Sequence, residues 1–326
     1  MKKPLSVYVH IPFCEKRCGY CDFLSCVEIK NIDQYLQRLC AEIQTFNFQD
    51  YQVQTIYIGG GTPSLLTVKQ LEILFHCLPS CCGEVTIEVN PNSLTRTKCE
   101  AYRRLGVNRL SIGVQSFDLA TLRDLGRLHD VKQAIAAIKL AHEYFNNVSI
   151  DLIKDIPHHR LVTPPVDVLK MIQHISIYSL TKDDHCVLDT DEAVNLPSDF
   201  VRYEVSNYAR EGYASKHNMV YWMGGEYIGF GAGAHSLINN QRFCNSNDIL
   251  NYQREPAVER SAEDVREEQI MLGLRVCSGV SLKLLHNKAD ELKMLADHGL
   301  VKLTPTHVIA TEAGLKVLNQ IWLRLV

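Results

Sequence analysis

The sequence lacks long apolar runs and runs of like charge, and both absences exclude classes of protein. No stretch of about 18 consecutive apolar residues occurs among the 326 residues, so a membrane-spanning helix is not expected. Lysine- and arginine-rich runs are also missing and the formal net charge is −3, which argues against nucleic acid as the main partner. Met1–Pro4 leads straight into a strand-like segment without the pattern of a signal peptide. We therefore expect a cytoplasmic protein.

The twelve cysteines do not resemble a disulfide framework. Outside a group near the N-terminus they fall mostly within apolar periodic segments, where buried free thiols are common. This usage fits a reducing compartment. The 46% hydrophobic and 22% charged content suits a chain with a sizeable core. At this length we expect one large domain and a smaller one.

Three of the cysteines, Cys14, Cys18 and Cys21, stand as C-x3-C-x2-C on one short loop behind a strand-like run. Thiolates this close together are soft ligands that suit zinc or an iron–sulfur cluster. From spacing alone, zinc, a cluster and buried thiols all stay open, and Cys26 or His10 could complete a zinc site. On a four-iron cluster, three thiolates would leave one iron free to bind a small molecule.

Strand-like and helix-like segments alternate from Val7 to about Leu180. The predicted strands are Ser6–Ile11, Thr55–Ile58, Glu84–Val89, Arg109–Val114, Val148–Ile153 and His174–Leu180. The predicted helices are Ile32–Phe46, Val68–Leu78, Arg96–Leu105, Val131–Phe145 and Val166–Ile172. Such alternation indicates βαβ units on a parallel sheet. Six units predict a partial (β/α)6 barrel, because a closed barrel of this type needs eight.

Functional residues of such folds gather at the carboxyl ends of the strands. The cysteine loop follows the first predicted strand, and Gly59–Pro63 follows the second. Glu88, Gln115 and Asp151 stand at or near the ends of the next three. The aromatic neighbours of the cysteines on that loop favour a shielded cofactor. The sequence therefore predicts one site on this rim.

The pattern changes beyond residue 180. Lys182–Asp199 is predicted to be a loop and Tyr203–Ala209 a strand, and a boundary is expected near Asn245–Arg254. This gives domains 1–245 and 246–326. The second domain is predicted to hold helices Ala262–Val276, Lys288–His298 and Glu312–Leu325 and strands Val301–Leu303 and Val308–Ala310. This order suggests a small winged-helix-like α+β domain, and without a basic surface we expect it to serve packing or partner binding.

The motifs of the chain resemble, in order, those of the HemN/HemW subgroup of the radical S-adenosylmethionine (SAM) superfamily. The matching segments are Tyr8–Cys14, Cys14–Cys21, Gly59–Ser64, Glu88–Pro91, Gly113–Phe117, Leu125–His129, Asp151–Ile153, Tyr203–Tyr208 and His217–Trp222. This subgroup holds oxygen-independent coproporphyrinogen III oxidase and a heme chaperone. The resemblance covers nearly the whole chain.

The resemblance implies a radical SAM barrel with a [4Fe–4S] cluster on Cys14, Cys18 and Cys21. Its implied SAM contacts are Tyr8, Tyr20, Cys21, Asp22, Gly60 and Glu88. In the oxidase a second SAM is held at positions that match Gly61, Thr62, Gln115, Arg127 and Asp151. It also implies a flavodoxin- or ferredoxin-like electron donor, and the sequence is compatible with a homodimer.

Three features favour the chaperone branch over the oxidase. Phe23 stands where the oxidase has a fourth cysteine, and the chain reaches Cys14 without a substantial N-terminal extension. His217–Trp222 matches the HNxxYW motif that is linked to heme binding in the chaperone branch. We therefore expect heme, with His217 in its site, to be passed to an acceptor hemoprotein. The alternatives are a coproporphyrinogen oxidase and a zinc-bound interaction module.

One segment departs from the relatives. They read Asp-Leu-Ile-Tyr-Gly-Leu-Pro-Gly where this chain has Asp151-Leu152-Ile153-Lys154-Asp155-Ile156-Pro157-His158. The glycines of that turn are lost and two charged residues stand near the expected SAM site. The segment between Leu180 and Tyr203 is also shorter by about one helix than in the relatives. A cluster-bearing protein with weak or no SAM turnover is therefore a further alternative.

Overall fold

A mixed sheet organises the part of the chain that the computed structural model describes, residues 2–180 and 194–326. Its strand order is β12-β11-β10-β9-β1-β2-β3-β4-β5-β6-β8-β7. The central parallel strands are β1 (Lys3–Ile11), β2 (Tyr51–Gly60), β3 (Glu84–Val89), β4 (Arg109–Gln115), β5 (Val148–Lys154) and β6 (His174–Ser179). All six lie where the sequence predicts strands.

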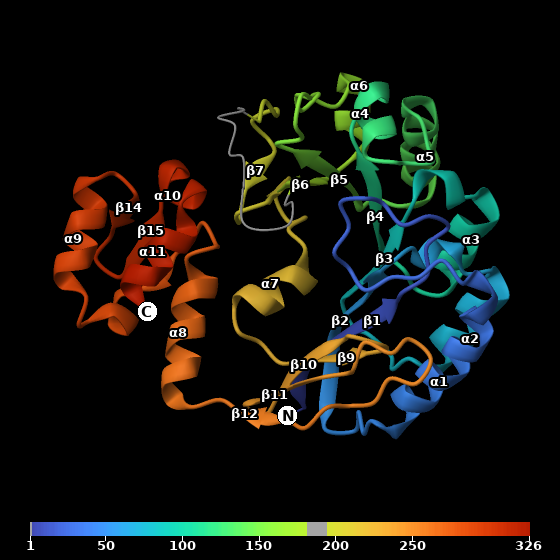
Figure 1. The fold of residues 1–326 in the computed structure, drawn as a ribbon, viewed down its shortest axis with the longest axis horizontal. Coiled ribbons are helices and arrows are strands. Elements are labelled where there is room, and N and C mark those ends of the chain that lie inside the picture. Colours follow the sequence, from blue (N-terminus) through green and yellow to red (C-terminus); the bar gives the residue numbers. More distant parts are fainter. Residues whose placement is uncertain (1, 181–193) are drawn as a thin grey trace.

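Helices cover the outer face of these strands (Figure 1). They are α1 (Ile32–Thr45), α2 (Val68–Cys77), α3 (Arg96–Arg104), α5 (Val131–Tyr144) and α6 (Val166–Met171). Each ends one residue before its predicted end, because that last residue is already the C-cap, with extended backbone at Phe46 and Phe145. A short helix that the sequence analysis did not predict, α4 (Leu119–Asp124), begins at an Asp118 cap. The α/β prediction of a partial (β/α)6 barrel is confirmed.

The sheet continues on both sides of the barrel strands. Beyond β1 lie β9 (Tyr227–Phe230), β10 (His235–Ile238), β11 (Gln241–Cys244) and β12 (Val258–Glu259), and beyond β6 lie β8 (Asn207–Ala209) and β7 (Val201–Arg202). The predicted strand Tyr203–Ala209 is therefore wrong over its first residues. There the chain turns between β7 and β8, and the Glu204 carboxylate accepts a hydrogen bond from the Ser206 backbone nitrogen at 2.9 Å. The predicted loop Lys182–Asp199 lies outside the described residues up to residue 193.

Helix α7 (Lys216–Trp222) lies between the barrel strands and the C-terminal lobe (Figure 1). It contacts β2, and the Ser215 side chain caps its N-terminus by accepting from the Asn218 backbone nitrogen. The sequence marks this segment as a motif, and its helical conformation is a finding of the structure.

The C-terminal lobe is a small α+β unit with a three-stranded antiparallel sheet in the order β13-β15-β14. Its elements are α8 (Ala262–Gly273), β13 (Val280–Ser281), α9 (Ala289–Asp297), β14 (Val301–Leu303), β15 (His307–Ala310), α10 (Glu312–Lys316) and α11 (Leu318–Leu325). The predicted helix Glu312–Leu325 is broken at Val317, whose backbone leaves the helical region at φ −118° and ψ 28°. The winged-helix-like arrangement is otherwise as expected.

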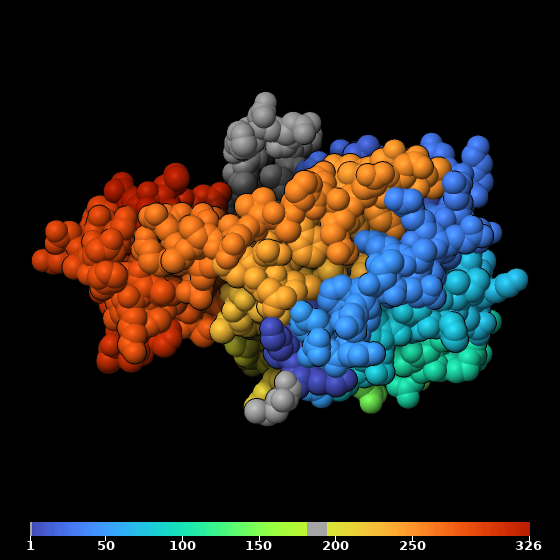
Figure 2. All heavy atoms as spheres, turned by 90° about the horizontal axis from the view of Figure 1, so that it is seen from below, coloured from blue at the N-terminus to red at the C-terminus, as the bar shows by residue number. Residues whose placement is uncertain are grey.

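Each lobe has its own core. Tyr252 belongs to the large apolar core of the barrel, and the core of the C-terminal lobe begins at Ile270. In the space-filling view the orange-to-red C-terminal lobe lies at the left, against the rest of the molecule (Figure 2). The domain division at residues 245 and 246 stays a prediction. Among the described residues, none of the helices is long and apolar enough to cross a membrane.

The turn after β5 keeps a glycine-like backbone without glycine. Asp155 has φ +60° and His158 has φ +67°, and these are the two positions where the resembled family carries glycine. A side chain in this region of backbone space costs about 1 kcal/mol or more. The chain therefore preserves the shape of the turn at a cost in stability.

We predict that His158→Gly raises the free energy of unfolding by about 1 kcal/mol, because His158 is exposed and its backbone strain would be relieved. Urea denaturation measures the change. His286→Gly is the matched control: His286 is also exposed, but its φ is −61°, so glycine there should destabilise. Equal destabilisation by both changes would contradict the strain argument.

Candidate functional site

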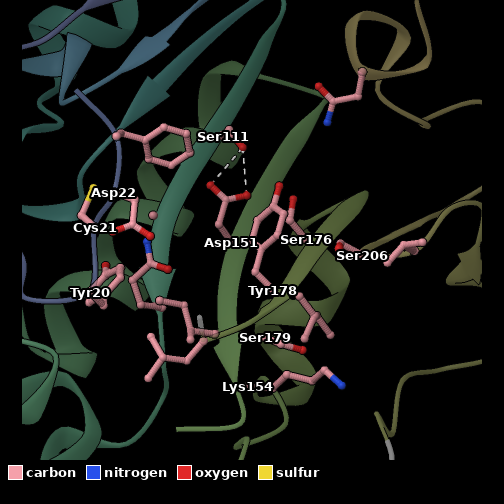
Figure 3. A pocket seen from close by; sticks show the side chains of 18 of the residues that line it. Tyr20, Cys21, Asp22, Ser111, Asp151, Lys154, Ser176, Tyr178, Ser179 and Ser206 are labelled. Carbon is pink, nitrogen blue, oxygen red and sulfur yellow. Dashed lines mark hydrogen bonds between the residues drawn. The ribbon is translucent and has the colours of Figure 1, made fainter. Parts of the chain in front are cut away.

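A cavity of about 990 Å³ opens between the carboxyl ends of the barrel strands and the C-terminal lobe. Figure 3 shows the cysteine-loop residues Tyr20, Cys21 and Asp22 on one side of it, with Tyr178 and Ser206 on the other. The structure brings together ten of the predicted site residues on its wall. They are Tyr20, Cys21, Asp22, Gly60, Gly61, Thr62, Glu88, Gln115, Arg127 and Asp151.

The cysteine loop is anchored at its base by the backbone. The Cys14 nitrogen donates to the Cys26 carbonyl at 2.9 Å, and the Cys26 nitrogen donates to the Pro12 carbonyl at 2.7 Å. A turn within the loop is closed by the Cys21 nitrogen donating to the Cys18 carbonyl at 3.2 Å. All three thiols are free and partly exposed. The loop thus presents them together beside the strand ends.

Two donors, one after β2 and one after α4, face the sulfurs of Cys14 and Cys18. The Thr62 hydroxyl donates to Cys14 Sγ at 3.6 Å, and Arg127 Nη1 donates to Cys18 Sγ at 3.6 Å. Burial raises the pKa of the Cys14 thiol, and the Thr62 hydrogen bond opposes that rise. A hydroxyl and a guanidinium directed at sulfur stabilise negative charge there, which is what thiolate ligation requires.

Arg127 is held firmly in this position. Its Nη2 donates to Asn90 Oδ1 at 2.7 Å and to the Gly113 carbonyl at 2.9 Å, and Tyr20 Oη lies 3.4 Å from Nη1. The resemblance implied Arg127 only as a contact to a second SAM. In the structure it also contacts the cysteine loop directly.

The donor set fits a cluster better than one zinc ion. In residues 2–180 and 194–326, no three His, Cys, Asp or Glu side chains converge closely enough to hold a single ion. His10 is engaged at both ring nitrogens, since Nδ1 lies 2.9 Å from Tyr8 Oη and Nε2 lies 2.9 Å from the Leu24 carbonyl. Thiols spread along one loop suit a cluster in which each of three irons takes one thiolate.

Glu88 lies on the cavity floor with two donors fixed to its carboxylate. The Tyr57 hydroxyl donates to Oε1 at 2.7 Å, and the Gly60 nitrogen donates to Oε2 at 3.1 Å. Burial raises the pKa of Glu88 to about 7, against the lowering effect of the Tyr57 hydrogen bond. Gly60 has φ +112°, and a Cβ there would lie 2.4 Å from the His10 ring, so no other residue fits.

Asp151 supplies a second carboxylate on the floor (Figure 3). The Ser111 hydroxyl lies 3.1 and 3.2 Å from its two oxygens, and burial raises the pKa of Asp151. Gln115 lines the same cavity, at an irregularity of β4 where its φ is +68°. With Glu88, these groups can accept hydrogen bonds from an ammonium or from ribose hydroxyls.

Sequence reasoning missed two buried charges at the barrel base. Arg109 is 2% exposed, lines the cavity, and donates from Nη2 to His174 Nδ1 at 3.3 Å. Glu84 is also buried and accepts from the backbone nitrogens of Lys216 and His217 at 3.1 and 3.2 Å. In the sequence, these two residues could have been found as the charged first residues of two predicted strands. Glu84 fastens the N-terminus of α7 to the barrel.

His217 does not reach the cavity. It is 1% exposed, with Nδ1 2.7 Å from Thr55 Oγ1 and Nε2 2.8 Å from Tyr221 Oη. Burial lowers its pKa to about 3, so the ring is neutral. Asn218, its neighbour on α7, lines the cavity instead. Tyr8, Cys14 and Cys18 are likewise not among the residues that line this cavity.

Comparisons with known proteins agree with this geometry. The sequence pattern of the radical SAM superfamily matches residues 8–161. The chain is 35% identical to the heme chaperone HemW of Lactococcus lactis, covering 99% of this chain and 97% of that one. It is 32% identical to HemW of Bacillus subtilis, covering 97% and 98%. Coproporphyrinogen III oxidase (HemN) of Escherichia coli has the same fold, with a TM-score of 0.80 over 99% of this chain and 90% of that one at 22% identity.

We predict that the contribution of Glu88 to the unfolding free energy of the unloaded protein falls as pH rises from about 4.5 to about 7. Its folded-state pKa is raised, so the folded state holds the proton more tightly and its stabilising contribution is lost as pH rises through about 7. Relative to Glu88→Gln, the wild type should therefore lose unfolding free energy as pH rises through that window. Denaturant titrations across the range test this. The exposed Glu211→Gln should follow the wild type, and an unchanged slope in Glu88→Gln would refute the prediction.

We predict that His217→Ala lowers the unfolding free energy by about 2–4 kcal/mol, because it leaves a cavity, removes the partner of the Tyr221 hydroxyl and leaves Thr55 only its bond to Ser6. The exposed His142→Ala on α5 should change stability little. Chemical denaturation compares the two. A loss no larger than that of His142→Ala would mean that the enclosed ring contributes nothing to the fold.

Proposed function

Since the chain belongs to the radical SAM superfamily and, within it, to the family of HemW heme chaperones, we propose that it carries a [4Fe–4S] cluster, binds SAM and heme, and passes heme to acceptor hemoproteins. The observation that carries this proposal is the cysteine loop itself. Cys21 lies on the wall of a cavity large enough for a substantial ligand, and Thr62 and Arg127 donate hydrogen bonds to the sulfurs of Cys14 and Cys18.

Different residues around the cavity would bind different groups of SAM. When bound, the cluster supplies the electron that cleaves the sulfonium of SAM. Cys14, Cys18 and Cys21 would hold it, and Arg127 donates a hydrogen bond to the Cys18 sulfur. Glu88 and Asp151 would accept hydrogen bonds from the ammonium and hydroxyl groups of SAM. Tyr20, beside Arg127, would close the cavity over the cluster-bound end.

The cavity leaves room for heme as well. Sites for small molecules span roughly 300–1,000 Å³, and this cavity lies at the upper end of that range. The lobe-facing wall carries apolar side chains of the C-terminal lobe, Val317, Leu318 and Trp322. Such a wall suits a planar macrocycle. Direct ligation of heme iron by His217 would require its ring to release the contacts with Thr55 and Tyr221.

Two features favour the chaperone over the oxidase. The relatives that match over nearly the whole chain are heme chaperones, whereas likeness to the solved oxidase extends to the fold alone. Phe23 stands 66% exposed on the cysteine loop, at the position of the oxidase's fourth cysteine.

The turn after β5 differs from that of the relatives where it meets the cavity. Lys154, where the relatives carry tyrosine, lines the cavity, and its Nζ lies 3.3 Å from Asp155 Oδ2. We therefore propose that SAM binds but is cleaved slowly.

We predict that Cys14→Ala, Cys18→Ala and Cys21→Ala each abolish cluster loading on anaerobic reconstitution, whereas the wild type takes up about four irons per chain. Iron and sulfide analysis with absorption spectroscopy measures loading. Cys26→Ala is the control, since Cys26 is a neighbour of the loop and not one of the three proposed ligands. Full iron retention in any of the three variants would contradict the ligand assignment, and uptake of zinc alone by the wild type would contradict the cluster.

We predict that the reconstituted protein binds heme stoichiometrically, transfers it to an apo-hemoprotein, and does not turn over coproporphyrinogen. Heme titration with and without SAM, followed by a transfer assay, tests the first two points. An electron donor of the flavodoxin or ferredoxin type should be supplied in the turnover assay. Conversion of coproporphyrinogen under those conditions would establish the oxidase instead.

A further inference from the structure

Arg275 is a cation of the cavity wall that the proposed function does not yet use. It follows α8 in the C-terminal lobe, and its side chain is 25% exposed. The nearest carboxylate oxygen recorded for it, Glu204 Oε2, is 4.0 Å away, at the limit of an ion pair. Its buried Nε has no hydrogen-bond partner among the described residues. Burial lowers the pKa of Arg275, as expected for a guanidinium that lacks close compensation.

The guanidinium groups of the other wall arginines, Arg109, Arg127 and Arg202, all donate hydrogen bonds, although the Nε atoms of Arg109 and Arg127 also lack a partner among the described residues. Arg202 donates to Glu312 across the lobes and to the backbone carbonyls of Glu204 and Val205. Arg127 is committed to the cysteine loop and Asn90. Arg275 therefore has hydrogen-bonding capacity that a bound anion can take up.

Arg275 is also held in place by both lobes. Its guanidinium lies 4.3 Å from the ring centroid of Trp222, the last residue of the HNxxYW segment on α7. Its chain neighbour Val276 pairs with Glu204, and the Cys277 nitrogen donates to the Tyr203 carbonyl at 3.0 Å. A cation stacked on an aromatic ring and fixed through its backbone is preorganised for a ligand.

The position of Arg275 assigns it to one end of the cavity. Glu204, its neighbour, also accepts from the Ser206 nitrogen at 2.9 Å. In Figure 3, Ser206 lies on the opposite side of the cavity from Tyr20, Cys21 and Asp22. The carboxylate of a SAM molecule bound at the cluster would lie by the cysteine loop. Arg275 therefore serves a different ligand group.

We propose that Arg275 binds a carboxylate of the ligand that fills the lobe-facing end of the cavity. On the proposed function, on which this inference rests, that group is a propionate of heme. The guanidinium of Arg275 presents a planar fork of N–H donors that matches a carboxylate. The apolar side chains of Val205, Leu318 and Trp322 line the same end and would face the macrocycle. Trp222 of the HNxxYW segment then acts on heme binding by positioning Arg275.

The test compares heme with its dimethyl ester, which lacks both carboxylates, in the cluster-loaded protein. We expect the wild type to bind heme about 10- to 100-fold more tightly than the ester, the range for a lost charge-assisted hydrogen bond. Arg275→Met should weaken heme binding by the same factor and leave ester binding unchanged. Arg275→Lys should recover part of the loss, since it keeps the charge without the fork. Arg254→Met is the matched control: Arg254 also stacks on an aromatic ring, Phe243 at 4.8 Å, but it is exposed and is not part of the cavity wall.

The outcomes separate the inference from the function that it rests on. Equal affinity of the wild type for heme and ester, or unchanged heme affinity in Arg275→Met, would overturn the role of Arg275 while leaving heme binding intact. Absence of saturable heme binding by the wild type would overturn the proposed function and the inference with it. Circular dichroism and cluster content confirm that the variants are folded, and the ester comparison in the wild type needs no variant at all.

Discussion

The pairing of β1 with β2 is the constraint on which the site depends. The two strands run parallel up to Ile11 and Gly60, and the hydrogen bonds continue beyond the last paired residues. The Gly61 nitrogen donates to the Ile11 carbonyl and the Thr62 nitrogen to the Phe13 carbonyl, each at 2.8 Å. This extension joins the base of the cysteine loop to the glycine turn. A Cβ at Gly61 would lie 2.8 Å from the Phe13 carbonyl oxygen, so the close approach requires glycine.

The elements that meet at the cavity bring negatively and positively charged side chains to different parts of its wall. The ends of β3 and β5 bring the carboxylates of Glu88 and Asp151 to the floor, where burial raises the pKa of both. Arg127 reaches the thiols from the turn after α4, and Arg275 enters from the C-terminal lobe. Acceptors therefore lie between two cationic regions. Such an arrangement can hold a cationic cofactor and a carboxylate-bearing ligand in one space without placing like charges together.

Helix α7 links the barrel to the second lobe. Its N-terminus is bound by Glu84, His217 is enclosed by Thr55 and Tyr221, and Trp222 at its other end stacks on Arg275. The HNxxYW segment thus acts as a structural connector from the barrel base to the cavity wall. A motif linked to heme need not present its histidine to the ligand in order to shape the site.

The sequence by itself determined where the helices and strands lie and which residues stand at the carboxyl ends of the strands. Helix periodicity and apolar strand runs are local, so the boundaries of α1 and β3 followed from neighbouring residues, as did the loop that carries Cys14, Cys18 and Cys21. Parallel connectivity then placed Glu88 and Asp151 on the same rim. Only the tertiary structure decided the edge strands β9–β12, the enclosure of His217 and the contacts of Arg127 with Cys18 and Arg275 with Trp222. The pairing of β9 with β1 and the contacts of His217 with Thr55, of Arg127 with Cys18 and of Arg275 with Trp222 join residues more than 50 positions apart, and no local pattern encodes which distant side chains will meet.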